Sequence, residues 1–445
     1  MEFPENLDFA EIAIKDKKDT GMKINSLHLE HYRCFESFDI DFDDSLTVLV
    51  GANGAGKTAT LDALSVFLRW AGHPVQRGNS CGMPITDVAI GSNAEDIVYR
   101  LSAKFSDNAD NVFNPLIFIF KKNIHNPRII KSRAPSAFAR IGQLLNKENP
   151  VFVGYMAGRF ISENDSVLKN GIYTPSEHAA FEKTFERTID YAATLSWFDS
   201  MDADEARAMR DSGQKTEMPE LMAVREALLK ALLGQYERPR MLGSPSELII
   251  YKKGTETAYK VSQLSDGYRA MLALVMDMAR RMAQAHGDVN PQGKPLLHYP
   301  AIVLIDEVEL HLHPSWQQTV LPTLMDIFPK TQFIVSTHSP QVLTAIPAKH
   351  IRILNDGKAY AFTEQTQGAE ASRLLKHVFG VDQRPQNLDI VKDLNNYTKL
   401  VYDEKWGAAE ALELKERLVD HYGDDDPKLM ELELHIENSM WEHGL

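Results

Sequence analysis

The chain has 445 residues, 44% of them hydrophobic and 25% charged, which is the balance of a globular protein long enough for up to about three domains. Its formal net charge is −14, but residues 401–445 hold 13 acidic and 4 basic side chains, so the other 400 residues together carry only −5. This composition excludes a disordered chain, and it leaves nucleic-acid binding by the nearly neutral body open.

Cysteine usage and the first residues of the chain indicate the compartment. The two cysteines, Cys34 and Cys81, lack the spacing of a metal site, so we expect neither a disulfide scaffold nor a zinc site. The first residues show no basic and apolar regions of a signal peptide, and no stretch approaches the ~20 apolar residues of a membrane span. We therefore expect a cytoplasmic protein with no membrane partner.

The N-terminal half begins with a polar segment, 1–21, that we interpret as a loosely held arm. From Met22, alternating apolar residues predict two short strands joined around residues 31–34, and residues 45–50 predict a buried strand. A glycine-rich turn and an apolar-periodic helix follow. Between about 85 and 160, segments such as 97–105 and 113–120 alternate as strands of an antiparallel sheet do.

The second half begins with a stretch of helical composition, which prolines and glycines divide into short helices rather than a coiled-coil arm. Residues 296–367 alternate strand, helix and strand, which is typical of a parallel α/β core. We therefore expect an α/β fold with an acidic helical C-terminal region. The predicted parts are a core of 22–174 and 243–367, a helical insertion at 175–242 and the C-terminal region at 368–445.

The glycine-rich turn carries the clearest chemical signal. Residues 51–58 read Gly-Ala-Asn-Gly-Ala-Gly-Lys-Thr and match the G-x-x-x-x-G-K-[ST] pattern between a strand and a helix. In such a loop, backbone N–H groups surround phosphate oxygens, Lys57 adds a charge toward the β- and γ-phosphates, and Thr58 offers its hydroxyl to Mg²⁺. We predict an ATP–Mg²⁺ site whose binding residues are Asn53, Gly54, Ala55, Gly56, Lys57 and Thr58.

A second signal is the apolar run 301–305, which ends in the carboxylates Asp306 and Glu307. Ligands of parallel sheets bind at the C-terminal ends of the strands. Together with the phosphate loop, this run is interpreted as a Walker B element. Asp306 is predicted to complete the metal site with Thr58, and Glu307 to polarise the attacking water as a catalytic residue.

Two further segments are weak signals of a nucleotide site when taken singly, but their order along the chain strengthens the prediction. Ser265 and Gly267 precede a long apolar helix, where an anion is favoured. His338 follows a second apolar run, 332–335, and stands at a predicted strand end.

These segments together resemble the ABC-type ATPase superfamily, in the branch that holds SMC-like heads, RecF and the OLD ATPases. The resemblance covers about 22–367 in pieces and implies an antiparallel β lobe on a parallel α/β core. It implies that two heads dimerise around ATP, so that Ser265 and Gly267 reach a partner's nucleotide in a homodimer or a higher even-numbered oligomer. It also implies that His338 senses the γ-phosphate as a catalytic residue with Lys57, and that Arg33 lies near the nucleotide.

The chain departs from this pattern in two respects. The signature lacks the glycine-glutamine pair of transporter heads, which makes a transporter subunit the least favoured reading. No convincing Q-loop occurs: Gln143 is the nearest candidate, and the segment 155–159 is similar to the tyrosine-to-arginine segment of this branch.

Two further features are open to alternative readings. His311 and His313 invite a metal site, but without partner ligands they are better explained as capping and packing residues. The run from Lys121 to Arg140 holds basic residues and no acid, so it is either a DNA-contacting surface or a solvated face.

The C-terminal region resembles a narrower family. Residues 378–385 and 423–427 are similar to the C-terminal region of PtuA, the ATPase subunit of Septu-type anti-phage systems, and of retron-associated relatives. This resemblance implies an HNH-type nuclease subunit, PtuB, as a partner controlled by nucleotide state. Residues 368–445 are too short and too helical for the toprim domain of an OLD nuclease, so we expect any cutting subunit to be another chain. A RecF-like repair ATPase and a structural ATP-binding protein with negligible turnover are the alternatives.

Overall fold

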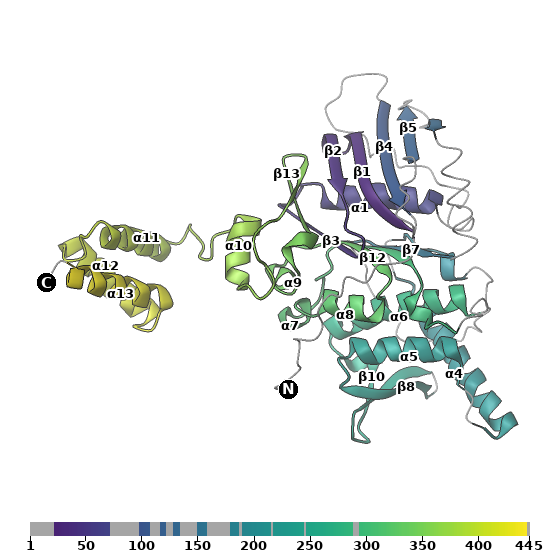
Figure 1. Ribbon diagram of the computed structural model, residues 1–445. Coiled ribbons are helices and arrows are strands. Elements are labelled where there is room, and N and C mark those ends of the chain that lie inside the picture. The colour runs from purple at the N-terminus through teal and green to yellow at the C-terminus, as the bar shows by residue number, and fades with distance from the viewer. Residues whose placement is uncertain are drawn as a thin grey trace. The chain divides into compact units, whose positions relative to one another are not determined.

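The computed structural model describes most of the chain, in two compact units, Met1–Leu374 and Leu375–Leu445 (Figure 1). Predicted features that fall wholly or partly outside the described residues include the arm 1–21, Cys81, Gln143 and Gly158–Arg159. The side chains of the basic run 121–140 also lie outside the description. The described residues are 22–71, 98–106, 116–121, 128–133, 149–157, 179–186, 189–214, 217–243, 246–287 and 293–442.

A six-stranded sheet forms the centre of the first unit. Its strand order is β14-β13-β3-β12-β11-β7, and every pairing is parallel except that of β14 with β13. Four consecutive strands of this sheet, β3, β12, β11 and β7, are buried along their whole length, as expected for parallel strands covered on both faces. The strands are β3 (Leu46–Val50), β7 (Val151–Tyr155), β11 (Ala301–Ile305), β12 (Thr331–Ser336), β13 (Ile351–Asn355) and β14 (Lys358–Ala361).

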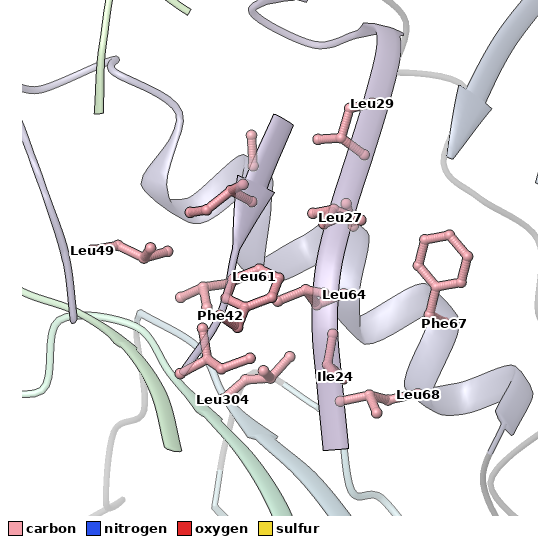
Figure 2. Close-up of a cluster of buried hydrophobic side chains, with 14 of the residues drawn as sticks. Ile24, Leu27, Leu29, Phe42, Leu49, Leu61, Leu64, Phe67, Leu68 and Leu304 are labelled. Carbon is pink, nitrogen blue, oxygen red and sulfur yellow. The ribbon is translucent and has the colours of Figure 1, made fainter. Parts of the chain in front are cut away.

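An antiparallel sheet of order β2-β1-β4-β5-β6 covers helix α1 (Lys57–Ala71) on the side away from the central sheet. Figure 2 shows the resulting core, in which side chains of β1 and α1 pack with Leu49 and Leu304 of the central sheet. The α/β fold with an antiparallel lobe is therefore confirmed, and the predicted strands at 97–105 and 113–120 correspond to β4 and β5. These strands are β1 (Lys23–Tyr32), β2 (Phe35–Asp41), β4 (Val98–Ser106), β5 (Leu116–Lys121) and β6 (Arg128–Arg133).

Helices α6 (Asp266–His286) and α8 (Val320–Ile327) lie on the other side of the central sheet in Figure 1. The interior of α6 is buried on all sides, from Met271 to Ala283, so this helix is part of the core rather than a surface helix. Shorter helical turns complete the unit: η4 (Ala179–Phe181), η5 (Val261–Gln263), η6 (Leu296–His298), α7 (Pro314–Gln317), α9 (Pro340–Leu343) and η7 (Ala348–His350).

The predicted short helices of the insertion are α4 (Tyr191–Ser212) and α5 (Pro219–Ala231). Gly213 ends α4 in the left-handed conformation, and Pro219 starts α5, as their chemistry favours. Residues 236–242, the last part of the predicted helical insertion, instead form β8 (Tyr236–Leu242). It pairs with β9 (Glu247–Lys252), which pairs with β10 (Ala258–Lys260). The sequence of β8, Tyr-Glu-Arg-Pro-Arg-Met-Leu, does not alternate apolar and polar residues and contains a proline, so it did not predict a strand. The register of β8 with β9 is irregular between residues 237 and 240.

The second unit contains three helices after α10 (Ala371–Phe379), which spans the boundary between the units. They are α11 (Asp389–Tyr402), α12 (Ala409–Tyr422) and α13 (Pro427–Glu442), and apolar side chains from all three form one core. Asp426 accepts hydrogen bonds from the backbone N–H groups of Lys428 and Leu429 and caps α13. Among the described residues, no helix is long and apolar enough to cross a membrane.

Candidate nucleotide-binding site

The glycine-rich loop connects β3 to α1, and two of its glycines are sterically required. A Cβ atom at Gly56 would lie 2.1 Å from the Phe35 ring, and one at Gly51 would lie 2.4 Å from the carbonyl oxygen of Leu354. Both residues also have positive φ angles, which other residues adopt only with strain. Asn53 and Gly54 are exposed, so the loop opens to solvent with the N-terminus of α1 behind it.

Lys57 lies at the centre of this loop and is only 6% exposed. Its ammonium group donates hydrogen bonds to the carbonyl oxygens of Gly51, at 2.8 Å, and Ala52, at 3.0 Å. Burial lowers the pKa of the Lys57 ammonium, although nearby carboxylates oppose this shift. The positive charge of Lys57 is thus held inside the glycine-rich loop by two of the loop's own carbonyl groups.

The C-terminal ends of three neighbouring strands bring the predicted metal ligands together. Asp306 follows β11 and is 1% exposed, and the hydroxyl of Thr58 donates to its Oδ2 at 2.8 Å. Ser336, the last residue of β12, donates to Asp306 Oδ1 at 2.5 Å. Among the described residues no group of three or more His, Cys, Asp or Glu side chains could hold a metal. One carboxylate and one hydroxyl nevertheless fit Mg²⁺, which in nucleotide sites takes its other ligands from phosphates and water.

Glu307 has a left-handed backbone conformation, with φ at 50°. Its N–H donates to Ser336 Oγ at 2.8 Å, so the same hydroxyl orients both Asp306 and the backbone of Glu307. Non-glycine residues in this conformation cluster at active sites, where the surrounding structure maintains them. Ser336 was not predicted; its position at the end of a predicted strand beside Walker B was the available signal.

Glu309 lies three residues after Asp306, and no catalytic or binding role was predicted for it. Its Oε2 accepts a hydrogen bond from the hydroxyl of Thr337 at 2.7 Å, and its Oε1 accepts one from the backbone N–H of His338 at 2.6 Å. The side chain of His338 is exposed. The predicted switch histidine, His338, therefore lies next to the Walker B segment, and the hydrogen bond that joins the two is made by the backbone N–H of His338 and not by its imidazole.

The signature-like segment begins α6. Ser265 occupies the N-cap position without a capping bond from its side chain, and it is exposed. A Cβ atom at Gly267 would lie 2.8 Å from the carbonyl oxygen of His311, so within one chain this glycine permits close packing against residues 311–313. The contact of Ser265 and Gly267 with a partner's nucleotide stays a prediction.

His311 and His313, the two histidines next to the signature-like segment, have different structural roles. His313 Nδ1 lies 2.9 Å from the hydroxyl of Ser315 and accepts from its N–H at 3.4 Å, so His313 caps α7. This confirms the capping interpretation for His313. His311 has a φ of 66° and lies in the turn that packs on Gly267.

Arg33 lies in the turn between β1 and β2. Its Nη1 donates to Asp62 Oδ2 at 2.5 Å, and Asp62 lies on α1 one turn after Thr58. In the same turn, the sulfur of Cys34 would lie 3.0 Å from a Cβ atom at Gly56. The turn therefore packs on the start of α1 beside the phosphate loop, and a direct contact of Arg33 with nucleotide stays a prediction.

A buried polar network connects this region to α6. Tyr155 ends β7, its carbonyl oxygen accepts from Asp306 N–H at 2.8 Å, and its hydroxyl donates to Asp277 Oδ2 at 3.0 Å. Asp277 also accepts from Arg280, at 2.7 Å, and from Arg281, at 2.8 Å. These two guanidinium groups hold the pKa of Asp277 well below its usual range, in spite of its burial.

Known proteins with similar sequences include the "Retron Ec83 probable ATPase" of Escherichia coli, which is 28% identical over 98% of this chain and 90% of its own length. "Septu protein PtuA" of Bacillus mycoides (strain KBAB4) is 22% identical over 74% of this chain and 40% of its own length. A solved SMC head bound to the C-terminal winged-helix domain of ScpA superposes with a TM-score of 0.45 at 16% identity, over 77% of this chain and 98% of the head.

The pattern of a known domain family matches residues 46–344, which is two thirds of the chain and includes the phosphate loop, Walker B and His338. The description of that family names an AAA domain, the AbiEii toxin and type IV toxin–antitoxin systems. The chain therefore belongs to the AAA_21 family of ATPase domains, and it is similar to the retron and Septu PtuA ATPases.

Proposed function

We propose that this chain binds and hydrolyses ATP with Mg²⁺, and that its nucleotide state controls a separate HNH-type DNA endonuclease in anti-phage defence. The observation that carries the ATPase part is the cluster at the ends of β3, β11 and β12. There Thr58, Asp306 and Ser336 are joined by hydrogen bonds beside the buried Lys57.

In the proposed reaction, the backbone N–H groups of the phosphate loop and Lys57 bind and orient the phosphates. Thr58 and Asp306 hold the magnesium ion, which supplies charge neutralisation at the phosphoryl group. Glu307 accepts a proton from the attacking water, and the His338 imidazole donates a hydrogen bond to the γ-phosphate.

Ser265 and Gly267 of a second copy complete the site in this proposal, so that ATP joins two heads. Closure with ATP and reopening after hydrolysis then provide two states that can bias an attached nuclease. The names of the similar retron and Septu ATPases support the defence role and, through the Septu resemblance, a nuclease partner.

The ATPase part is tested with Lys57→Ala and Glu307→Gln. Lys57→Ala should weaken ATP binding about ten- to hundred-fold, because charge-assisted hydrogen bonds to phosphate are lost. Glu307→Gln should lower turnover by about 10²- to 10⁴-fold, the usual contribution of a general base, and leave ATP binding nearly unchanged. Both are measured by equilibrium ATP binding and steady-state phosphate release.

Lys253→Ala is the matched control, because Lys253 is an exposed lysine in the turn between β9 and β10. It should behave as wild type in both assays. A wild-type chain that binds no ATP would end the proposal, and Glu307→Gln with normal turnover would remove Glu307 from the reaction.

The nuclease part is tested by co-expression with the neighbouring gene product, followed by measurement of the complex mass and of DNA cleavage with and without ATP–Mg²⁺. A stable complex with nucleotide-dependent cleavage is expected. A chain that purifies alone and binds DNA tightly and in a salt-sensitive manner, without cleavage, would support the RecF-like alternative.

A further inference from the structure

The segments after β11 and after β12 are joined by the carboxylate of Glu309. Both oxygens of Glu309 are used: Oε1 accepts from the His338 N–H at 2.6 Å, and Oε2 accepts from the Thr337 hydroxyl at 2.7 Å. The donors lie 28 and 29 residues farther along the chain, and Thr337 is fully buried. This bridge is a tertiary contact and not part of either strand ladder.

The backbone and hydroxyl groups of Thr337 are held in place by other hydrogen bonds. The N–H of Thr337 donates to the Leu49 carbonyl at 3.1 Å, and its Oγ1 accepts from the Ser339 N–H at 3.0 Å, so its hydroxyl proton is available for Glu309. An ionised carboxylate is an acceptor only and can satisfy two donors at once with charge-assisted bonds. A glutamine at this position would accept from one donor and present an N–H group to the other.

The bridge lies next to two other contacts between the same segments. The Glu307 N–H donates to Ser336 Oγ at 2.8 Å, and the Val308 N–H donates to the Ser336 carbonyl oxygen at 3.0 Å. Residues 306–309 and 336–338 are therefore held together at consecutive positions. Glu309 forms the last of these contacts, and it alone reaches the backbone of His338.

We infer that Glu309 is a positioning residue: by binding the backbone of Thr337–His338, it fixes the His338 imidazole relative to Glu307 and so to the γ-phosphate. It acts through His338 and does not itself contact the nucleotide. This inference rests on the proposed ATP hydrolysis and assigns to it a residue outside the predicted catalytic and binding residues. Its consequence is that Glu309 and His338 are energetically coupled in turnover.

The test is a double-mutant cycle of Glu309→Gln and His338→Ala, with kcat, KM and ADP affinity measured for each protein. Glu309→Gln should lower kcat about ten-fold or more, as expected when a charge-assisted bond is lost, and leave ADP affinity unchanged. In the His338→Ala background the same change should alter kcat less than about two-fold, because the residue that Glu309 positions is already removed. Glu309→Asp, which keeps the charge, should recover part of kcat.

Glu205→Gln is the matched control. Glu205 also accepts from one backbone N–H, that of Met218 at 3.1 Å, and from one side chain, that of Arg225 at 2.6 Å, but it lies in α4. This variant should lose thermal stability without a change in kcat. A Glu309→Gln effect on kcat that is equally large in the His338→Ala background would overturn the inference.

A second measurement does not depend on hydrolysis. In the nucleotide-free protein, amide hydrogen exchange in a peptide covering 336–339 should rise about ten-fold in Glu309→Gln and should not rise in Glu205→Gln. If exchange is unchanged, the bridge does not hold this segment and the inference fails, whether or not the chain hydrolyses ATP. If exchange rises but the wild-type chain shows no ATP turnover, the proposed function fails and with it the catalytic role of Glu309.

Discussion

The two units of the chain bury different kinds of side chain. The first unit buries ionised groups, including Asp277, Arg280 and Arg281, each at most 4% exposed. In the described part of the second unit, 375–442, every buried residue is apolar or aromatic, and ion pairs such as Lys415 with Glu433 lie at the surface. Burying an ion is tolerated only where partners compensate for lost hydration, so the first unit depends on specific polar geometry and the second on hydrophobic packing.

The largest expected effect comes from breaking the buried network. Asp277→Asn keeps the size of the side chain but leaves the guanidinium groups of Arg280 and Arg281 without their carboxylate. We expect the free energy of unfolding of the first unit to fall by about 3–5 kcal/mol, the usual result when one partner of a buried ion pair is removed. Denaturant unfolding monitored by tryptophan fluorescence measures it.

The matched control lies on the same helix. Asp266 forms the same i,i+3 pair, with Arg269, at the exposed start of α6. Asp266→Asn should leave the free energy of unfolding nearly unchanged, because exposed ion pairs contribute little. Equal losses in the two variants would show that burial is not what makes the network important.

The stability of the second unit should be most sensitive to a cavity in its hydrophobic core. Leu418 of α12 is fully buried in the three-helix core, and Leu418→Ala should destabilise this unit by about 2–5 kcal/mol. Leu412→Ala, on the same helix but 56% exposed, should change stability by no more than about 0.5 kcal/mol. Differential scanning calorimetry checks both.

The same calorimetric scans show whether the units unfold independently. We expect Leu418→Ala to lower one transition temperature and to leave the transition of the nucleotide-binding unit in place. A shift of both transitions would mean that the two units stabilise each other, which would weaken the comparison between them.

The smallest effect concerns a group that the first unit buries in its neutral form. His286, at the end of α6, is 1% exposed and stacks on Tyr299 with ring centroids 3.8 Å apart. Burial lowers its pKa to about 4. The unfolded chain therefore binds a proton near pH 6.5 that the folded protein binds only near pH 4, so stability is complete above about pH 6.5 and falls as the pH drops toward 4.

Between pH 7 and pH 5 this difference removes about 2 kcal/mol of stability. His286→Phe should flatten this part of the pH dependence, measured by denaturant unfolding at several pH values. His421→Phe, in the second unit, is the control and should follow the wild-type curve. If the stability of His286→Phe fell with pH as steeply as that of the wild type, the burial of a neutral His286 would not be the cause of this pH dependence.

Much of the site could be predicted because its signals are local. The glycines of 51–56 are needed by the turn itself, and an apolar run that ends in Asp306 and Glu307 is visible in the sequence. Parallel strands place their C-terminal ends at one edge, so the hydrogen bond between Thr58 and Asp306 agrees with this expectation. The β8 strand was missed because its sequence does not alternate apolar and polar residues and contains Pro239.

The fold class, the phosphate loop and the two carboxylates after β11 follow from the sequence, because glycine geometry, apolar periodicity and motif spacing act within a few residues. The folded structure is needed to see that Ser336 orients Asp306, that Glu309 holds the backbone of His338, and that Tyr155 reaches Asp277. These partners lie 29 to 122 residues apart in the chain. Their pairing depends on strand order and helix packing, which no local pattern encodes.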